Sequence, residues 1–228
     1  MDPRPSLLAA FTASAWLALA PTPIQAGDGG TAAPGAAPQR FEEIPATTET
    51  LRQLRNGGFV LYLRHGMTDN QQADRVPTVD LSDCSTQRPL TEEGRLMAGK
   101  VGEAIRRSRI PIGEIRSSPL CRAVGSARAA FPTQAFVVDQ DLMYTANLTA
   151  SQKAPIIANT RHLLSTPVPT GTNRLLLAHA PNLMDLIGYF PKEATLVIFR
   201  PGGEGRFDYV ASIPPGLWPE LQGTGRAR

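Results

Sequence analysis

The sequence is poor in histidine and cysteine. Only three histidines and two cysteines occur among 228 residues. No histidine has ligand spacing to a cysteine, so the usual cysteine–histidine zinc site is excluded. The G-x-S-x-G, Walker A and H-E-x-x-H patterns are also missing. Lys and Arg form no block and the formal net charge is only +3, which argues against a nucleic-acid partner. No metal or other cofactor is predicted.

Long hydrophobic runs are missing too. The longest uncharged, largely apolar stretch is residues 7–20, and its 14 residues are too few to cross about 30 Å of hydrocarbon as a helix. It follows Arg4 and precedes Ile24 and Ala26, which occupy the −3 and −1 positions of a signal-peptidase site. We therefore expect residues 1–26 to be a signal peptide, and the mature protein to be periplasmic or secreted without a membrane span. An uncleaved anchor or a buried core helix is the alternative.

Export changes how the two cysteines are interpreted. Cys84 and Cys121 are an even pair in what would be an oxidising compartment. A disulfide between them would close a loop of about 38 residues, worth on the order of 3–4 kcal/mol in the chain-entropy model. Two free thiols are the alternative.

Composition divides the rest of the chain into a linker, one domain and a tail. Residues 27–39 are rich in Gly, Ala and Pro without apolar periodicity, so 27–42 is predicted to be a flexible linker. The domain is predicted over 43–214 and a flexible tail over 215–228. A hydrophobic share of 42% and a charged share of 19% are ordinary for a globular domain.

Apolar periodicity predicts alternating helices and strands. Helices are expected near residues 47–57, 90–108, 122–130, 151–164 and 182–189. Strands are expected near 59–63, 112–117, 135–138 and 174–180, followed by a hairpin over 194–213. The alternation predicts an α/β fold, a three-layer α/β/α sandwich whose mainly parallel sheet is covered on both faces.

Three of the predicted strands end in polar motifs that precede a helix or a turn. They are LRHG at 63–66, SSPLCR at 117–122 and AHAP at 178–181. The carboxyl ends of parallel strands lie along one edge of an open sheet, so we expect this edge to bring together Arg64, His65, Arg122 and His179. Two guanidinium groups and two imidazoles suit a tetrahedral dianion. The sequence therefore predicts a phosphate site and a small phosphorylated substrate.

These motifs resemble the histidine phosphatase superfamily, branch 1, whose fold is phosphoglycerate-mutase-like. RHG, PLTEEG at 89–94, SSPLCRA and HAPN at 179–182 occur in the family's order between residues 61 and 183. The resemblance is greatest to small bacterial members, and the run DLSDCSTQRPLTEEG at 80–94 resembles an exported subgroup.

The resemblance implies a metal-independent phosphatase. His65 would attack phosphorus and form a phosphohistidine that water then hydrolyses. Arg64, Arg122 and His179 would also stabilise the charge of the transferred group. The implied phosphate-binding residues are Arg64, Thr68, Gln71, Arg122 and His179.

The sequence departs from the family at the proton donor. Many branch 1 members carry a glutamate as LxE after the strand that follows the second arginine, whereas this chain has LMY at 142–144. The other branch places an aspartate after the second histidine, where this chain has Ala180. Asp141 is the predicted donor, ahead of Asp139 and Asp69. Because a glutamate is missing, a non-catalytic phosphate-binding or interaction protein on the same fold is the alternative.

Two other basic residues are interpreted separately. Arg88 is expected either to line the mouth of the pocket or to be solvated, and His162 is expected on the surface of a helix. A mutase is disfavoured, because the region 75–90 offers little insertion with which to retain a phosphorylated intermediate.

Overall fold

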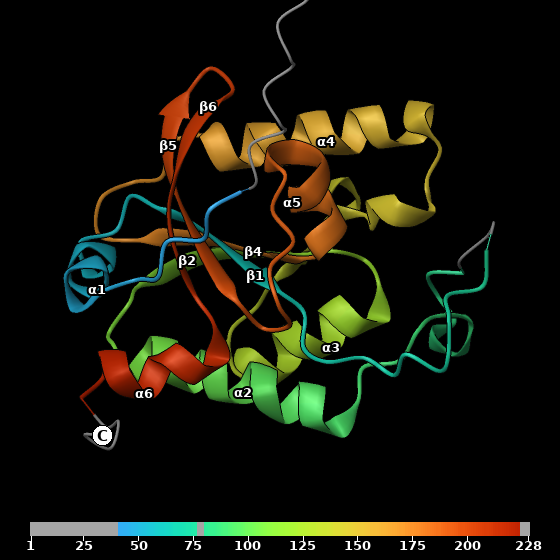
Figure 1. Ribbon diagram of the computed structural model, residues 1–228, viewed down its shortest axis with the longest axis horizontal. Coiled ribbons are helices and arrows are strands. Elements are labelled where there is room, and N and C mark those ends of the chain that lie inside the picture. Colours follow the sequence, from blue (N-terminus) through green and yellow to red (C-terminus); the bar gives the residue numbers. More distant parts are fainter. Residues whose placement is uncertain (1–40, 77–79, 224–228) are drawn as a thin grey trace, which may run out of the picture. The chain divides into compact units, whose positions relative to one another are not determined.

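A six-stranded sheet forms the middle of the computed structural model, which describes residues 41–76 and 80–223 (Figure 1). The strand order is β3-β2-β4-β1-β5-β6. Four strands pair in parallel: β1 (Val60–Arg64), β2 (Ile112–Ser117), β3 (Val137–Val138) and β4 (Asn173–Ala178). An antiparallel hairpin, β5 (Leu196–Gly203) and β6 (Arg206–Ile213), completes the edge beside β1. The predicted, mainly parallel sheet is confirmed.

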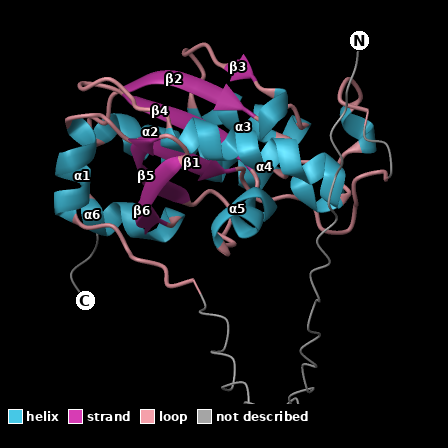
Figure 2. Ribbon diagram, turned by 90° about the horizontal axis from the view of Figure 1, so that it is seen from above, coloured by secondary structure: helices cyan, strands magenta, loops and turns pink. Residues whose placement is uncertain are grey.

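Helices cover both faces of this sheet (Figure 2). The helices of the described residues are α1 (Thr48–Arg55), α2 (Glu92–Arg107), α3 (Cys121–Ala130), α4 (Ala150–Ser165), α5 (Ala180–Ile187) and α6 (Trp218–Leu221). Helices α1, α2, α3 and α6 supply one buried hydrophobic cluster, and α4 and α5 supply the other. Figure 1 shows α2, α3 and α6 on one side of the sheet and α4 and α5 on the opposite side. The three-layer α/β/α sandwich is thereby confirmed.

Strand β1 shows why the central strands are apolar throughout. Leu61 and Leu63 belong to the first cluster, whereas Val60 and Tyr62 belong to the second. Successive side chains of a strand point to opposite faces, and both faces of this sheet are covered by helices. A continuous apolar run is the expected result.

Helix α2 begins as the sequence predicts. The Thr91 hydroxyl accepts a hydrogen bond from the Gly94 N–H at 3.0 Å, which is an N-cap. Val101 and Ile105 are buried on the face that packs against the sheet. Met97, one turn earlier on the helix, is only partly buried.

The prediction of a flexible tail over 215–228 is wrong for its first part. Residues 215–217 form a 3-10 turn and α6 follows, with Trp218 only 4% exposed in the first hydrophobic cluster. The Gln222 amide donates to the Ala104 carbonyl oxygen at 2.9 Å. A four-residue helix is too short to show an apolar period, so the sequence does not predict it. Contacts with α2 hold it in place. At the other end, Phe41 of the predicted linker stacks on Tyr189 at 4.2 Å between ring centroids.

The remaining predicted segments lie outside the described residues. These are the signal peptide over 1–26, the linker up to residue 40, and the end of the tail over 224–228. Between residues 41 and 223, leaving aside 77–79, the structure has no helix with the length and apolar character to cross a membrane.

Candidate active site

The ends of β1 and β4 bring the two histidines together. The strands pair in parallel with Arg64 opposite Ala178, and the His65 N–H continues the ladder by donating to the Ala178 carbonyl oxygen at 3.1 Å. His65 and His179 are the next residues on each strand, and their ring centroids lie 5.2 Å apart. Two residues that are more than a hundred positions apart in sequence therefore share one edge of the sheet.

A glycine must follow His65 because the chain passes directly against α2. A Cβ on Gly66 would collide with the backbone carbonyl of Gly94, and a Cβ on Gly94 would collide with the backbone of Met67. The Gly66 N–H donates to the Ser126 hydroxyl at 3.0 Å, and that hydroxyl donates to the Arg122 carbonyl oxygen at 2.8 Å. The glycines of RHG and PLTEEG are thus two sides of one close backbone approach.

His65 is held in a single tautomer. It is 5% exposed, and its Nδ1 lies 2.7 Å from the Gly66 carbonyl oxygen. A carbonyl can only accept a hydrogen bond, so Nδ1 carries the proton and Nε2 keeps its lone pair. Burial, followed by the charge of Arg122, lowers the pKa of His65 from 6.5 to about 3. The imidazole is therefore neutral at pH 7, with a nucleophilic nitrogen available.

His179 is fixed by two hydroxyl groups. The Tyr62 hydroxyl donates to the His179 carbonyl oxygen at 2.7 Å and accepts from the His179 N–H at 3.0 Å. The Ser118 hydroxyl lies 2.6 Å from Nε2, and if it donates there, the ring proton resides on Nδ1. Burial and the charge of Arg122 lower the pKa of His179 well below 6.5. The ring is neutral, and its buried Nδ1 has no hydrogen-bond partner among the described residues.

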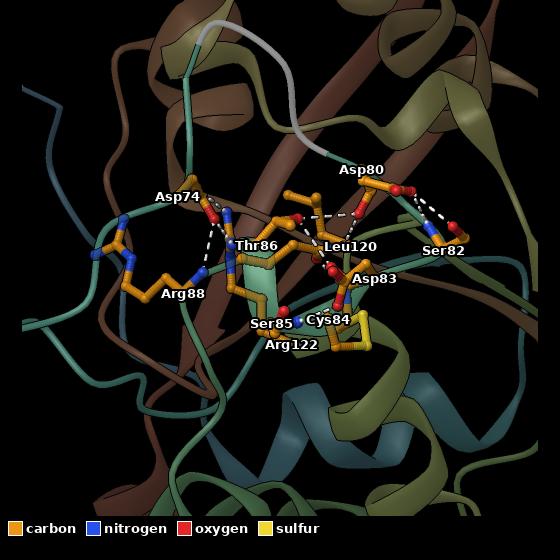
Figure 3. Close-up of a disulfide and its surroundings, with 12 residues drawn as sticks. Asp74, Asp80, Ser82, Asp83, Cys84, Ser85, Thr86, Arg88, Leu120 and Arg122 are labelled. Carbon is orange, nitrogen blue, oxygen red and sulfur yellow. Dashed lines mark hydrogen bonds and ion pairs between the residues drawn. A yellow bond between two sulfur atoms is a disulfide. The ribbon is translucent and has the colours of Figure 1, made fainter.

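Arg122 is paired with a carboxylate that the sequence motifs do not reveal. Its Nη1 and Nη2 donate to the two Asp74 carboxylate oxygens at 2.8 and 3.2 Å, and both side chains are nearly inaccessible. Figure 3 shows Asp74 also meeting the backbone of Arg88, whose N–H donates to Oδ1 at 2.9 Å. Burial acts to raise the pKa of Asp74, but the hydrogen bonds from Arg122 and Arg88 outweigh it and lower the pKa. Asp74 is therefore ionised.

Arg64 is held by a second carboxylate at the other side of the site. Its Nη2 donates to Glu193 and its Nη1 to the Pro191 carbonyl oxygen, both at 2.6 Å. The Arg88 guanidinium bonds Asn70 Oδ1 at 3.3 Å and is near enough to the histidines to act on them electrostatically. Its charge contributes to lowering the pKa of both His65 and His179.

The site carries one positive charge in excess. Three guanidinium groups, those of Arg64, Arg88 and Arg122, act electrostatically on the histidines. Two carboxylates are bonded to them: Asp74 to Arg122 and Glu193 to Arg64. The Nε of each of these arginines is buried and lacks a hydrogen-bond partner among the described residues. Buried donors of this kind call for an acceptor, and an anion with several oxygens suits them. Within residues 41–76 and 80–223, no cluster of three or more His, Cys, Asp and Glu side chains is placed to hold a metal ion.

A disulfide fastens the loop that carries Arg88. Cys84 and Cys121 are bonded with their Cα atoms 5.7 Å apart, which decides between the two alternatives left by the sequence. Cys84 lies in a 3-10 turn, residues 84–86, and Cys121 is the first residue of α3. Gln87, which is fully buried, accepts the Cys121 N–H at 2.7 Å. Both cysteines line a groove of about 580 Å³, together with Arg95 and Arg128.

Among the described residues, three predicted site residues have no hydrogen bond to the histidines. The buried Thr68 forms a backbone bridge with Leu90, and no partner of its hydroxyl is found among the described residues. Gln71 is exposed. Asp141 is half-buried, and its backbone N–H donates to Asp139 at 2.9 Å. The structure brings Arg64, His65, Arg122 and His179 together, whereas among the described residues the Asp141 side chain has no hydrogen bond or ion pair to any of them.

The roles of several residues at the site could not be predicted from the sequence. Asp74 and Glu193 lie in irregular segments with no apolar period, so only the fold reveals their pairing with arginines. Tyr144 is different, because it stands in the LMY segment where a donor was sought. Its ring lies edge-on to His179, with centroids 5.2 Å apart, and the Arg122 guanidinium carbon lies 4.8 Å from its centre.

The comparisons with known proteins agree with this arrangement. The model of the histidine phosphatase superfamily (branch 1) matches residues 60–143, which include His65, Arg122 and Asp141 but not His179. This match supports branch 1 of that superfamily and, with the sheet order and layers, a phosphoglycerate-mutase-like fold. None of the curated proteins compared with the chain matches it.

Solved structures of low identity resemble the chain. The protein histidine phosphatase SixA complexed with tungstate is 16% identical, over 69% of this chain and 97% of that chain, with a TM-score of 0.48. The putative phosphohistidine phosphatase SixA from Agrobacterium tumefaciens is 18% identical, over 69% and 99%, with a TM-score of 0.44. A structure described as mycobacterial hydrolase 1 is 18% identical, over 68% and 98%, with a TM-score of 0.49.

Proposed function

We propose that the protein is an exported, metal-independent phosphatase that hydrolyses phosphomonoesters through a phosphohistidine on His65. The superfamily supported by the match over 60–143 implies phosphatase activity in general. The observation that carries the finer proposal is the state of His65: a buried, neutral imidazole, protonated on Nδ1 and free on Nε2.

The nucleophilic step follows from that state. The lone pair of Nε2 attacks phosphorus, while the Nδ1–H bond to the Gly66 carbonyl oxygen holds the ring and stabilises the positive charge that the ring acquires. Arg64, Arg122 and Arg88 supply the cationic surroundings that a phosphoryl dianion requires, through Nε–H groups that lack protein partners. His179 adds its Nδ1. In this proposal the arginines neutralise the phosphoryl charge, so a chelator such as EDTA should leave the activity unchanged.

Covalent trapping tests the proposal. The wild-type protein is mixed with a radiolabelled phosphate donor and quenched without acid, which preserves phosphohistidine. We expect label on the wild type and none on His65→Ala. His162→Ala is the matched control, because His162 is exposed on α4 and lies outside the site. Label that persists in His65→Ala would contradict the proposed nucleophile.

The alternative is a phosphate-binding protein without catalysis. Binding of phosphate or vanadate by a wild-type protein that hydrolyses neither p-nitrophenyl phosphate nor alkyl phosphates would support it. Such a result would keep the anion site and reject the phosphatase.

Export is supported by two independent features. The apolar leader over residues 7–20 precedes a signal-peptidase pattern, and the disulfide between Cys84 and Cys121 is typical of oxidising compartments. Fractionation of cells that express the full chain tests this part: we expect a processed protein that begins at Gly27, outside the cytoplasm.

A further inference from the structure

Tyr144 lies beside His179 and Arg122, and its hydroxyl has no hydrogen-bond partner among the described residues. Its ring packs edge-on against His179 and beneath the Arg122 guanidinium, at 5.2 and 4.8 Å. The hydroxyl interacts electrostatically with both Arg64 and Arg122, since each of their pKa values responds to it. Between residues 41 and 223, outside the gap at 77–79, no group is hydrogen-bonded to it. The tyrosine as a whole is half-buried.

Two carboxylates of the site and the two hydroxyls that fix His179 are already engaged. Asp74 is ionised and accepts two hydrogen bonds from Arg122. The Glu193 carboxylate accepts a hydrogen bond from Arg64 at 2.6 Å. The hydroxyls of Tyr62 and Ser118 are bonded to His179. Tyr144 is thus the residue beside the histidines that offers a phenolic hydroxyl with no hydrogen-bond partner among the described residues.

We propose that Tyr144 is the general acid and base of the reaction, donating its phenolic proton to the departing oxygen of a phosphomonoester. The proposal rests on the proposed function. It differs from the sequence-based prediction of Asp141, whose carboxylate makes no hydrogen bond to the residues of the site in the described part of the chain.

The two half-reactions balance as follows. In the first, the Nε2–P bond forms, the ester P–O bond breaks, and the phenolic proton passes to the departing alkoxide, so that an alcohol leaves. In the second, water attacks phosphorus and gives a proton to the Tyr144 phenolate, while the N–P bond breaks and phosphate leaves. The cations of Arg64 and Arg122 stabilise the phenolate between the two steps. An alkyl phosphate, whose leaving group needs a proton, becomes an accessible substrate class.

The test is Tyr144→Phe, which removes the hydroxyl and keeps the ring that contacts His179 and Arg122. For glycerol phosphate we expect kcat/KM to fall by about 10²–10⁴-fold. For p-nitrophenyl phosphate, whose leaving group needs little proton donation, we expect a first half-reaction within about threefold of wild type, measured as the burst of nitrophenolate. Tyr209→Phe is the matched control, since it removes a phenol that is bonded to Ser212 in β6.

Each outcome has a separate meaning. An equal loss on both substrates would overturn the proposal, because a structural role of Tyr144 affects every substrate alike. A loss confined to glycerol phosphate in Asp141→Asn, with none in Tyr144→Phe, would assign the proton to Asp141 and also overturn it. Failure of the wild type to acquire label on His65 would reject the proposed phosphatase itself, and is seen before any Tyr144 variant is compared.

Discussion

The candidate site has two walls that are built in different ways. The histidine wall consists of the residues that follow β1 and β4, 64–66 and 179–180, and it is held by backbone hydrogen bonds that extend the sheet. The loop wall consists of residues 67–76 and 80–90, whose secondary structure is limited to one 3-10 turn and the isolated bridge between Thr68 and Leu90. It is held by a few specific links: Asp74 to Arg122, Gln87 to Cys121, and the disulfide.

The two walls therefore depend on different contacts. The histidine wall cannot shift without breaking the pairing of two central strands, so its geometry should persist through most single substitutions. The loop wall should lose its position when one link is removed. Four predictions test this difference, from the largest expected effect to the smallest.

Removal of Asp74 should be the most damaging change to the loop wall. Asp74→Ala leaves the buried Arg122 guanidinium without its carboxylate, and breaking a buried pair costs about 3–5 kcal/mol. We expect the free energy of unfolding in urea to fall by that amount. Asp69→Ala is the control, because among the described residues its carboxylate bonds only the nearby Gln71 N–H. A loss below about 1 kcal/mol would mean that the pair does not fasten the loop wall.

The disulfide should come next. Cys84→Ser combined with Cys121→Ser should lower the free energy of unfolding by about 3–4 kcal/mol, since the bond closes a loop with a sequence separation of 37. At temperatures where the double variant stays folded, His65 should still accept label, because the histidine wall does not depend on this link. A reducing agent should bring the wild type to the stability of the double variant. Complete loss of labelling in a folded double variant would show that the two walls are not independent.

The same contrast explains what the sequence could predict. The histidine wall follows from local signals, namely apolar strands that end in polar residues, together with the rule that parallel strands end along one edge. The position of His179 beside His65 needed no side-chain detail. The loop wall has no such signal, because Asp74 and Gln87 are fixed by contacts with α3 that no period in the sequence marks. The short helix α6 was missed for the same reason.

Acid should weaken the histidine wall. The pKa of His65 is about 3 in the folded protein against 6.5 ordinarily, so the unfolded state binds more protons between these values. The contribution of the neutral histidine to the free energy of unfolding is therefore fully present above about pH 6.5. It falls as the pH is lowered, by about 1.4 kcal/mol per pH unit for each buried neutral histidine. His65→Gln should reduce this slope between about pH 5 and 6.5, where carboxylates contribute little. His162→Gln, at an exposed position, should leave it unchanged; equal slopes in all three proteins would contradict the buried neutral state.

Arg88 should have the smallest effect on stability and reveal what the loop wall contributes to binding. Its guanidinium is half-buried and bonds Asn70 at 3.3 Å, so Arg88→Gln should change the free energy of unfolding by less than about 0.5 kcal/mol. The same substitution removes the one positive charge that exceeds the two carboxylates of the site. We therefore expect KM for a phosphate dianion to rise roughly fivefold to tenfold, or about 1–1.4 kcal/mol, with the difference shrinking at high salt. Arg75→Gln removes an equal charge from an exposed position of the same loop and should leave KM unchanged. If both variants raised KM equally, the loop wall would act through its overall charge and not through the particular position of Arg88.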